Sequence, residues 1–407
     1  DERRTEFERM GIPVIQAMAY RRGDAADWAA DPQGVQLMDV PFYLAQAEYA
    51  GVTDIQIAAA TRKGDEQLEP IAAQSAAVAG KALNLAKLQR KAAADRRVAM
   101  FFWNYPAGEK NLSASFMNLP RSFVSTLAAL QAAGYRTEVQ DEKPLTLLLQ
   151  RLLKPAYEPP QNQEVLRDLV REGLAGRLPL SDYKRWLASL PASVQQQLRD
   201  AWGEPEKSSM VLSQGGERFF VIPRLQLGNV SLLPQPTRGE RGGDKEKALY
   251  HSTSAAPSHY YLATYLWARQ TFAADALVHF GTHGSQEWLP GKERGLSASH
   301  DFPMLAVGDV PVVYPYIVDN VGESTQARRR GRATIISHQT PAFAPAGLHA
   351  ALTEIHDLLH HWLAQEEGGV KEKIKADFLA RVKKERIAAD MGWSDTRIAA
   401  EFPAFVT

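Results

Sequence analysis

Two histidines and a glutamate recur at intervals of four residues in the run His279-Phe280-Gly281-Thr282-His283-Gly284-Ser285-Gln286-Glu287. On a continuous helix this spacing would align the three side chains, but the glycines and the apolar residues before them favour a turn after a strand. Imidazole and carboxylate groups can hold a borderline divalent metal, and both can accept a proton near neutral pH. The pattern alone leaves two interpretations open: a metal and proton-transfer site, or histidines that only form hydrogen bonds within a tight turn.

The position of this run in the chain adds to its interest. Residues 276–280 are apolar enough to predict a buried strand, and they lead directly into Gly281. Ligands of open α/β sheets bind beyond the carboxyl ends of the strands, so residues after Phe280 are expected to face a ligand. The strands predicted around it cover 97–106, 135–139, 218–223, 230–236, 310–318 and 333–337. The predicted helices cover 69–97, 120–133, 258–272, 345–364 and 370–390.

These elements predict a multi-domain α/β protein, with stacked parallel or mixed sheets flanked by helices and a helical insertion. The length of 407 residues is consistent with two or three domains. The expected divisions are an N-terminal partial α/β region with a long helix (1–95), an α/β core carrying the site (96–141 plus 206–345), a helical insertion (142–205) and a C-terminal helical region (346–407).

Composition excludes several classes of function. Lysine plus arginine equals aspartate plus glutamate at 47 each, so no global field favours nucleic acid or an anionic membrane. The sequence contains no apolar run of the roughly 18 residues that a membrane span needs, and we expect a cytoplasmic protein. Without cysteine, any metal chemistry must use His, Asp, Glu or solvent. The chain begins without Met, and we expect it to be an internal segment of a longer protein.

Long stretches of the sequence resemble a known family. The run from His279 to Lys292, continuing through Gly295-Leu296-Ser297, is similar to the signature of the large subunits of cobalt chelatase and magnesium chelatase. The resemblance continues through residues 308–330 and 338–341, and upstream it includes 235–239, 250–251 and 257–265. It covers about 235–365 and is looser over 97–139. The stretch Tyr314-Pro315-Tyr316-Ile317-Val318 favours the cobalt branch.

This resemblance implies a tetrapyrrole-binding catalytic subunit that inserts Co²⁺ into hydrogenobyrinic acid a,c-diamide during cobalamin biosynthesis. Separate AAA+ ATPase subunits would hydrolyse ATP. The sequence agrees, since Gly291-Lys292-Glu293 lacks both the earlier glycine and the Ser/Thr of a phosphate-binding loop. The alternatives are a magnesium chelatase H-type subunit acting on protoporphyrin IX, or a non-catalytic tetrapyrrole- or metal-binding protein. A His/Glu metallohydrolase is a third, although the sequence lacks a His-Glu-x-x-His motif.

Within this family, metal insertion requires removal of the metal's waters and of two pyrrolic protons. We therefore predict Glu287 as the leading proton acceptor, His283 as metal-delivery ligand or second base, and His279 as its support or co-ligand. Further residues are expected to bind the ring or line its cavity: Lys292, Asn320, Glu323, Gln326 and Arg329. For Lys292 and residues 328–330, a solvated charge cluster is the alternative.

Other histidines are left out of the predicted site. For His251 and His259 we favour structural hydrogen bonds over ligation. His356, His360 and His361 lie on a Leu-rich helical stretch, where the first two have the spacing of helical metal ligands. A solvated helix face is the favoured interpretation for these three.

Overall fold

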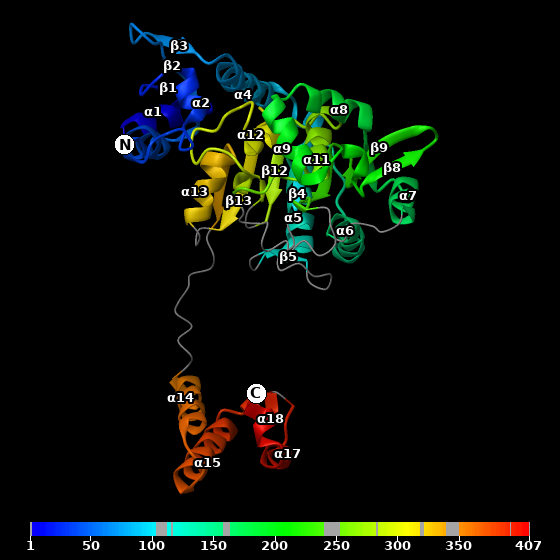
Figure 1. Cartoon of the computed structure of the whole chain (residues 1–407). Helices are drawn as coiled ribbons and strands as arrows, with labels where there is room; N and C mark the ends of the chain where they lie inside the picture. Colours follow the sequence, from blue (N-terminus) through cyan, green and yellow to red (C-terminus); the bar gives the residue numbers. More distant parts are fainter. Residues whose placement is uncertain are drawn as a thin grey trace. The chain divides into compact units, whose positions relative to one another are not determined.

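The computed structural model describes residues 2–102, 112–114, 117–157, 163–239, 253–281, 284–317, 321–338, 350–390 and 392–406. The chain divides into two compact units, one up to His338 and the other from Gln339 onward. The first unit contains the predicted α/β sheets, shown in Figure 1.

A six-stranded sheet forms the centre of the first unit. Its strands are β4 (Val98–Phe102), β10 (Leu225–Leu227), β11 (Val230–Pro234), β12 (Ala276–Phe280), β13 (Val312–Ile317) and β14 (Ala333–His338). Their spatial order is β10-β11-β4-β12-β13-β14, and all neighbours are parallel except β10 and β11. The chain adds β11 on one side of β4 and then crosses to add β12 on the other. The carboxyl ends of β4 and β12 therefore flank the point where the strand order reverses, which is where ligands bind in doubly wound sheets.

Helices cover both faces of this sheet because its strands are apolar on both sides. On β4, Ala99 and Phe101 pack into one core together with α11 (His259–Leu266) and α12 (Phe302–Val307). The alternate residues of β4 pack into a second core with α5 (Leu119–Ala132) and α6 (Glu142–Tyr157). Parallel strands buried on both faces have continuous apolar sequences, and this is why the sequence predicted them well.

The predicted helical insertion at 142–205 contains a strand that the periodicity did not reveal. The helices found there are α6, α7 (Glu164–Arg171), α8 (Leu180–Ala188) and α9 (Ala192–Trp202). Between them, β7 (Ala175–Pro179) pairs with β9 (Glu217–Pro223), which also pairs with β8 (Val211–Gln214). The predicted strand at 218–223 is thus confirmed, but it belongs to this small antiparallel sheet and does not extend the central one.

The strand predicted at 135–139 was wrong. Gly134, at φ +84°, follows α5 as predicted, but the next residues form no ladder. The backbone carbonyl of Arg136 accepts one hydrogen bond from Asn229, and the Tyr135 hydroxyl accepts one from Arg96. These single bonds hold an extended segment against the end of the sheet. The parallel neighbour of β4 on this side of the sheet comes later in the chain and is β11.

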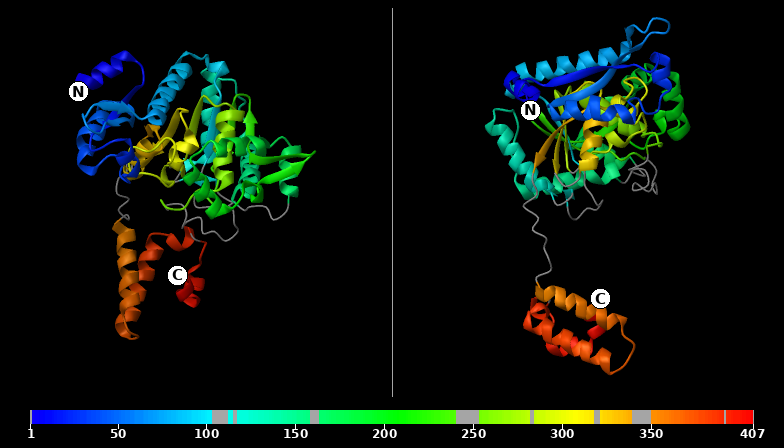
Figure 2. Two further views of the ribbon diagram at one scale, coloured as in Figure 1. Left: turned by 45° about the horizontal axis from the view of Figure 1, so that its top comes forward. Right: turned by 90° about the vertical axis from the view of Figure 1, so that its left-hand side faces the viewer.

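The N-terminal segment forms its own three-stranded sheet beside the central one (Figure 2). Its elements are α1 (Glu2–Met10), β1 (Val14–Tyr20), α2 (Ala25–Ala30), η1 (Leu37–Asp39), η2 (Val40–Ala45), α3 (Gln46–Tyr49), β2 (Val52–Thr61), β3 (Leu68–Pro70) and α4 (Ala72–Arg90). Here β1 runs parallel to β2, and β3 antiparallel to it. The long helix predicted at 69–97 is confirmed as α4, although residues 69 and 70 belong to β3 and the helix ends at Arg90.

A buried ionic cluster joins this segment to the amino ends of β13 and β14. Arg332 donates to Asp54 Oδ2 at 2.7 and 3.1 Å and to Asp309 Oδ1 at 3.1 Å. Lys81 of α4 donates to the backbone carbonyls of Val310 and Arg332, each at 3.1 Å. Burial, aided by the charge of Arg332, lowers the pKa of Lys81 to about 7. Folding is therefore less favourable in free energy at any pH at which this lysine is charged.

We expect the free energy of unfolding of a Lys81→Met variant to depend on pH differently from that of the wild type. Between pH 7 and 9 the unfolded chain holds the Lys81 proton and the folded chain does not, so the wild type becomes more stable as pH rises. Relative to the variant, the free energy of unfolding of the wild type should rise by about 2–3 kcal/mol over that interval. Urea unfolding at pH 7, 8 and 9 measures it. A constant difference between the two proteins would show that Lys81 stays charged.

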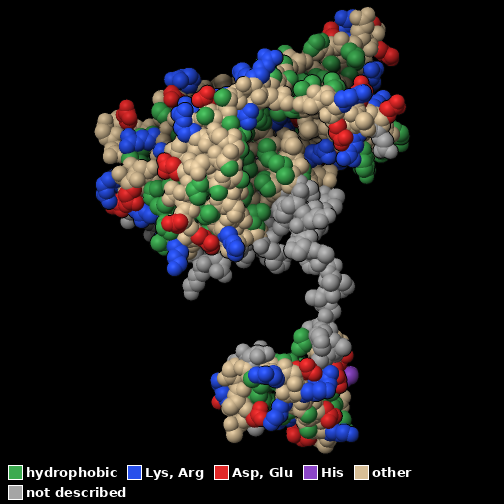
Figure 3. All heavy atoms as spheres, turned by 180° about the vertical axis from the view of Figure 1, so that it is seen from behind, with side chains coloured by type: hydrophobic (Ala, Val, Ile, Leu, Met, Phe, Trp, Pro, Cys, Tyr) green, Lys and Arg blue, Asp and Glu red, His purple; other side chains and the backbone are tan. Residues whose placement is uncertain are grey.

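The second unit is helical, as the sequence predicted. It consists of α14 (Ala350–Ala364), α15 (Gly369–Lys384), α16 (Ile387–Asp390), α17 (Asp395–Ala400) and α18 (Phe402–Val406), which share a small core around Ile355, Phe378 and Phe402. Among the described residues of both units, no helix is long and apolar enough to cross a membrane. Figure 3 shows basic and acidic side chains interspersed over one face of the molecule, in agreement with the balanced composition.

Candidate functional site

Polar and aromatic side chains form a buried row across the carboxyl half of the central sheet. His279 of β12 is in register with Phe101 of β4, and their ring centroids lie 5.5 Å apart. On the other side, the His279 ring lies 4.5 Å from the ring of Tyr314, which comes from β13. All three side chains project to the face covered by α11, because residues alternate between the faces of a strand.

Glu287 lies next to this row and is fully buried. It belongs to η6 (Gln286–Trp288), a short turn that follows β12 and brings the carboxyl back against the sheet. The Tyr314 hydroxyl donates a hydrogen bond to Glu287 Oε2 at 2.8 Å. Among the described residues, no hydrogen-bond partner contacts Glu287 Oε1. One carboxyl oxygen is therefore fixed by a tyrosine, and the backbone N–H groups of Glu287 and Gly284 also act on the carboxyl.

The surroundings of Glu287 make it a base suited to neutral pH. Burial raises the pKa of Glu287 to about 7, and the negative charge of Glu323 adds to this effect. The hydrogen bond from Tyr314 acts in the opposite direction by stabilising the charged form. A carboxyl that changes protonation near the working pH can both take up and release a proton efficiently.

His279 has the opposite character. Burial lowers the pKa of its imidazole to about 3, so the ring is neutral at physiological pH. Its Nε2 atom lies 3.3 Å from the Tyr265 hydroxyl, and Nδ1 has no hydrogen-bond partner within the described parts of the chain. A neutral imidazole with such a low pKa is a poor proton acceptor at pH 7 but keeps a lone pair that a metal ion can use.

The loop carrying Glu287 approaches the sheet closely because Gly284 has no side chain. A Cβ atom at this position would overlap the His279 ring and the Tyr314 hydroxyl. This close approach gives a packing reason for glycine at position 284.

Two tyrosines of α11 extend the polar network. Tyr265 exchanges hydrogen bonds with the Gln235 amide at 3.1 and 3.2 Å, and Tyr261 lies 2.8 Å from Ser285 Oγ. Gln235 follows β11, so the network brings together side chains from β11, β12 and β13 and from their covering helix. It fixes the ring of His279 from the side opposite Tyr314.

A single arginine holds the turn that carries Glu287. Arg330, at the end of α13 (Val321–Arg330), is 5% exposed and donates to the backbone carbonyls of Glu287, Leu289 and Lys292. Its planar guanidinium presents several N–H donors in a fixed fork, a geometry that the ammonium of lysine does not have. The position of the Glu287 carboxyl thus depends on Arg330.

This arrangement can be compared with known proteins. The sequence profile described as CobN/Magnesium Chelatase matches residues 1–407. The chain belongs to this family. Among the relatives of this chelatase-family chain, the aerobic cobaltochelatase subunit CobN of a Sinorhizobium species is 32% identical over 372 residues, which is 89% of this chain. The magnesium chelatase H-type subunit of Rhodobacter capsulatus is 28% identical over 382 residues, or 86% of this chain.

A solved structure shows the same similarity in three dimensions. The catalytic subunit of cobaltochelatase from Mycobacterium tuberculosis matches 94% of this chain with a TM-score of 0.70 and 30% identity. The chelatase-family chain covers 32% of that structure, 28% of the Sinorhizobium CobN and 29% of the Rhodobacter protein. It therefore spans less than a third of the length of these relatives.

The structure brings two of the three predicted central residues together. Glu287 and His279 both contact Tyr314, whereas His283 lies outside the described residues. Within those residues, no group of three or more His, Cys, Asp or Glu side chains could hold a metal ion. The metal-ligand set of His279, His283 and Glu287 thus stays a prediction for this chelatase-family chain.

The residues predicted to bind the ring do not form one cluster in the described parts of the structure. Glu323 lies on α13, where its charge reaches Glu287, and Gln326 lies on the same helix. The Arg329 guanidinium forms a two-point ion pair with Glu48, both bonds being 2.9 Å. Asn320 lies outside the described residues.

Lys292 is directed to the N-terminal segment. Its ammonium donates to the carbonyls of Ala29 and Asp31 at 2.9 and 2.6 Å and lies 5.1 Å from the centre of the Trp28 ring. These contacts favour a structural role for Lys292, and the ion pair with Glu48 does the same for Arg329. Their ring-binding roles stay predictions.

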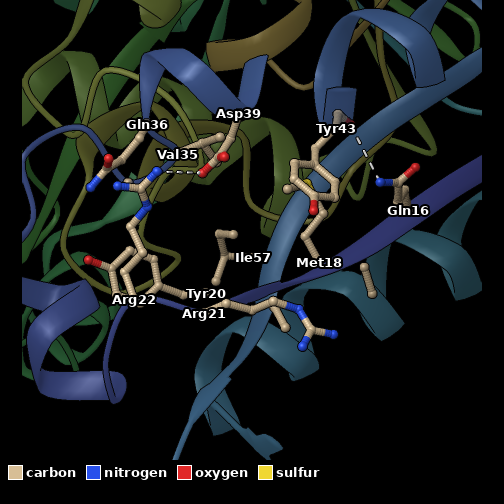
Figure 4. Close-up of a pocket in the computed structure, with 13 residues that line it drawn as sticks. Gln16, Met18, Tyr20, Arg21, Arg22, Val35, Gln36, Asp39, Tyr43 and Ile57 are labelled. Atoms are coloured by element: carbon tan, nitrogen blue, oxygen red, sulfur yellow. Dashed lines mark hydrogen bonds and ion pairs between the residues drawn. The ribbon is translucent and has the colours of Figure 1, made fainter. Parts of the chain in front are cut away.

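A pocket of about 300 Å³ lies near these contacts, in the N-terminal segment (Figure 4). Met18, Val35, Ile57 and Tyr43 form its apolar wall, and polar groups including the Arg22–Asp39 pair stand at its edge. None of the predicted site residues lines it. No pattern in the sequence indicated this pocket, because its walls come from β1 and from turns whose pairing depends on tertiary structure.

Proposed function

We propose that this chain forms the metal-insertion region of the large subunit of an ATP-dependent cobalt chelatase. The observation that carries the proposal is a fully buried carboxyl, Glu287, with a pKa of about 7 beside the point where strand order reverses in the central sheet. The substrates would be Co²⁺ and a corrin precursor, hydrogenobyrinic acid a,c-diamide, in the synthesis of cobalamin.

In this proposal the two central residues divide the work. Each pyrrolic nitrogen must lose its proton to bind the metal, and Glu287 Oε1 accepts such protons one at a time and passes them to solvent. His279 remains neutral and offers its imidazole to the incoming ion, with His283 as a second ligand. Tyr314 holds the Glu287 carboxyl in place and stabilises its charged form. Because Glu287 is fully buried, the ring must bind against this end of the sheet with some movement of the adjoining loops.

The energy for metal insertion would come from other subunits of the assembly. The chain lacks a phosphate-binding loop, and we propose that separate AAA+ ATPase subunits hydrolyse the ATP in the cytoplasm. Relatives named for magnesium chelatase cover this chain as fully as those named for cobaltochelatase. Insertion of Mg²⁺ into protoporphyrin IX is therefore the second candidate function.

Binding of the ring distinguishes the two candidates. We expect the intact subunit that contains this chain to bind hydrogenobyrinic acid a,c-diamide more tightly than protoporphyrin IX by at least about tenfold in Kd, equivalent to about 1.4 kcal/mol. Absorbance titrations of each ring, with and without Co²⁺, measure this difference. The reverse preference would assign the chain to the magnesium branch, and a folded intact subunit that binds neither ring would refute the proposal. Turnover upon addition of the ATPase subunits separates an enzyme from a protein that only binds the ring.

A further inference from the structure

The C-terminal unit carries two histidines whose ring nitrogens face each other at the surface. His356 and His360 occupy successive turns of α14, and their side chains point away from Ile355, which packs in the core of the unit. The Nε2 atoms lie 3.2 Å apart. Figure 3 shows histidine side-chain atoms at the surface of this unit.

This separation matches what one metal ion would impose on two imidazoles. With metal–nitrogen bonds of about 2.0–2.1 Å, nitrogens 3.2 Å apart subtend about 100° at the ion, between octahedral and tetrahedral angles. The two Nε2 atoms form a hydrogen bond with each other, so one of them carries a proton that the ion would displace. Residues four apart on a helix share one face, so the backbone itself holds this spacing.

A carboxylate lies near one of the rings. Asp357 Oδ1 lies 3.5 Å from His356 Nδ1, the nitrogen on the far side of the ring from the pair. Metal-binding histidines usually direct their second nitrogen to a carboxylate or carbonyl, which fixes the tautomer and makes the ligating nitrogen more basic. Both His356 and Asp357 are about half exposed, so ions reach the pair directly from solvent.

We propose that His356 and His360 form a surface binding site for a divalent transition-metal ion. Imidazole ligands select Ni²⁺, Zn²⁺ and Co²⁺ over Mg²⁺, which prefers oxygen. With two protein ligands, the ion keeps its other positions for water or for groups of another molecule, so binding is reversible. The inference rests on α14 alone and does not depend on the proposed chelatase activity.

Metal titration of the intact protein tests this site. We expect calorimetry to show binding of Co²⁺ and Ni²⁺, with Ni²⁺ the tighter, and no comparable binding of Mg²⁺. His356→Ala and His360→Ala should each weaken this phase by at least about tenfold, since losing one ligand removes the chelate effect. Asp357→Asn should weaken it by up to about tenfold.

His361→Ala is the matched control, because His361 is exposed on the same helix but outside the pair. It should leave the metal affinity unchanged, and helix content by circular dichroism should be equal in all variants. Equal loss of affinity in His361→Ala, unchanged affinity in His356→Ala, or no Co²⁺ or Ni²⁺ binding by the wild type would overturn the proposal. Ring binding measured in parallel stays a separate result, so failure here does not count against the proposed function.

Discussion

Replacing Glu287 with glutamine is expected to lower kcat for metal insertion by about 10²–10⁴-fold, the usual contribution of a positioned general base. Glutamine keeps the shape of the side chain and can still accept the hydrogen bond from Tyr314, but it cannot take up a pyrrolic proton. In the wild type, kcat should rise with pH through about 7, as Glu287 ionises. Insertion kinetics of the intact subunit with the proposed ATPase subunits measure both effects. Unchanged kcat in Glu287→Gln would remove this residue from the reaction.

As pH rises, the free energy of unfolding of Glu287→Gln should increase relative to that of the wild type. The pKa of Glu287 is about 7 in the folded chain and near 4.5 when unfolded, so the wild type loses stability as pH rises from about 4.5 to 7. Glutamine stays neutral and avoids this loss. Between pH 4 and pH 8 its free energy of unfolding should rise by about 3 kcal/mol relative to the wild type. Denaturant unfolding measures this gain, which a damaged fold would not show.

Tyr314→Phe provides a graded control for the proton-acceptor role. It removes the hydrogen bond that stabilises the charged carboxyl, so the pKa of Glu287 should rise further. The midpoint of the pH–rate profile should move to higher pH by up to about one unit, while the rate at the high-pH plateau changes less. A midpoint that stays in place would indicate that another group controls the profile.

The sequence predicted the central sheet well because its strands are buried on both faces. Runs such as Val98–Phe102 and Ala276–Phe280 are apolar throughout, and the carboxyl end of the second run predicted where a ligand site should lie. The strand Ala175–Pro179 was missed because its residues alternate weakly and its pairing partner lies some forty residues further along the chain. Local periodicity carries no information about such a partner.

The candidate site was predicted in its central residues but not in what supports them. Glu287 and His279 belong to one short run of residues that can bind metal or transfer protons. Tyr314 and Tyr265 come from separate elements, and only the fold shows that they lie next to that run. One feature of the sequence could have indicated Tyr314: it lies in a predicted strand that ends near the site. Arg330 was harder to recognise, because its neighbours on α13 are also arginines and charge runs usually face solvent.

Arg330 is expected to have the largest effect on stability among the residues near the site. An Arg330→Ala variant leaves the carbonyls of Glu287, Leu289 and Lys292 buried without their donor. Such losses cost about 1–3 kcal/mol for each buried group, so the free energy of unfolding should fall by at least about 3 kcal/mol in total. Arg329→Ala is the comparison outside this turn: that side chain forms a largely buried two-point ion pair with Glu48, and its loss should cost less than that of Arg330 because it leaves one group, Glu48, without its partner.

The kcat of an Arg330→Lys variant distinguishes two roles of Arg330: positioning the Glu287 carboxyl, or only stabilising the fold. Lysine restores a charge but not the planar set of donors, so the turn should fold with the Glu287 carboxyl displaced. A displacement of about 1 Å can reduce kcat by roughly 10²-fold, while the Kd for the ring changes little because Arg330 does not contact it in the proposed site. If kcat recovers fully in a stable Arg330→Lys protein, the arginine supports the fold alone. If kcat stays low with ring affinity intact, Arg330 sets the position of the proton acceptor.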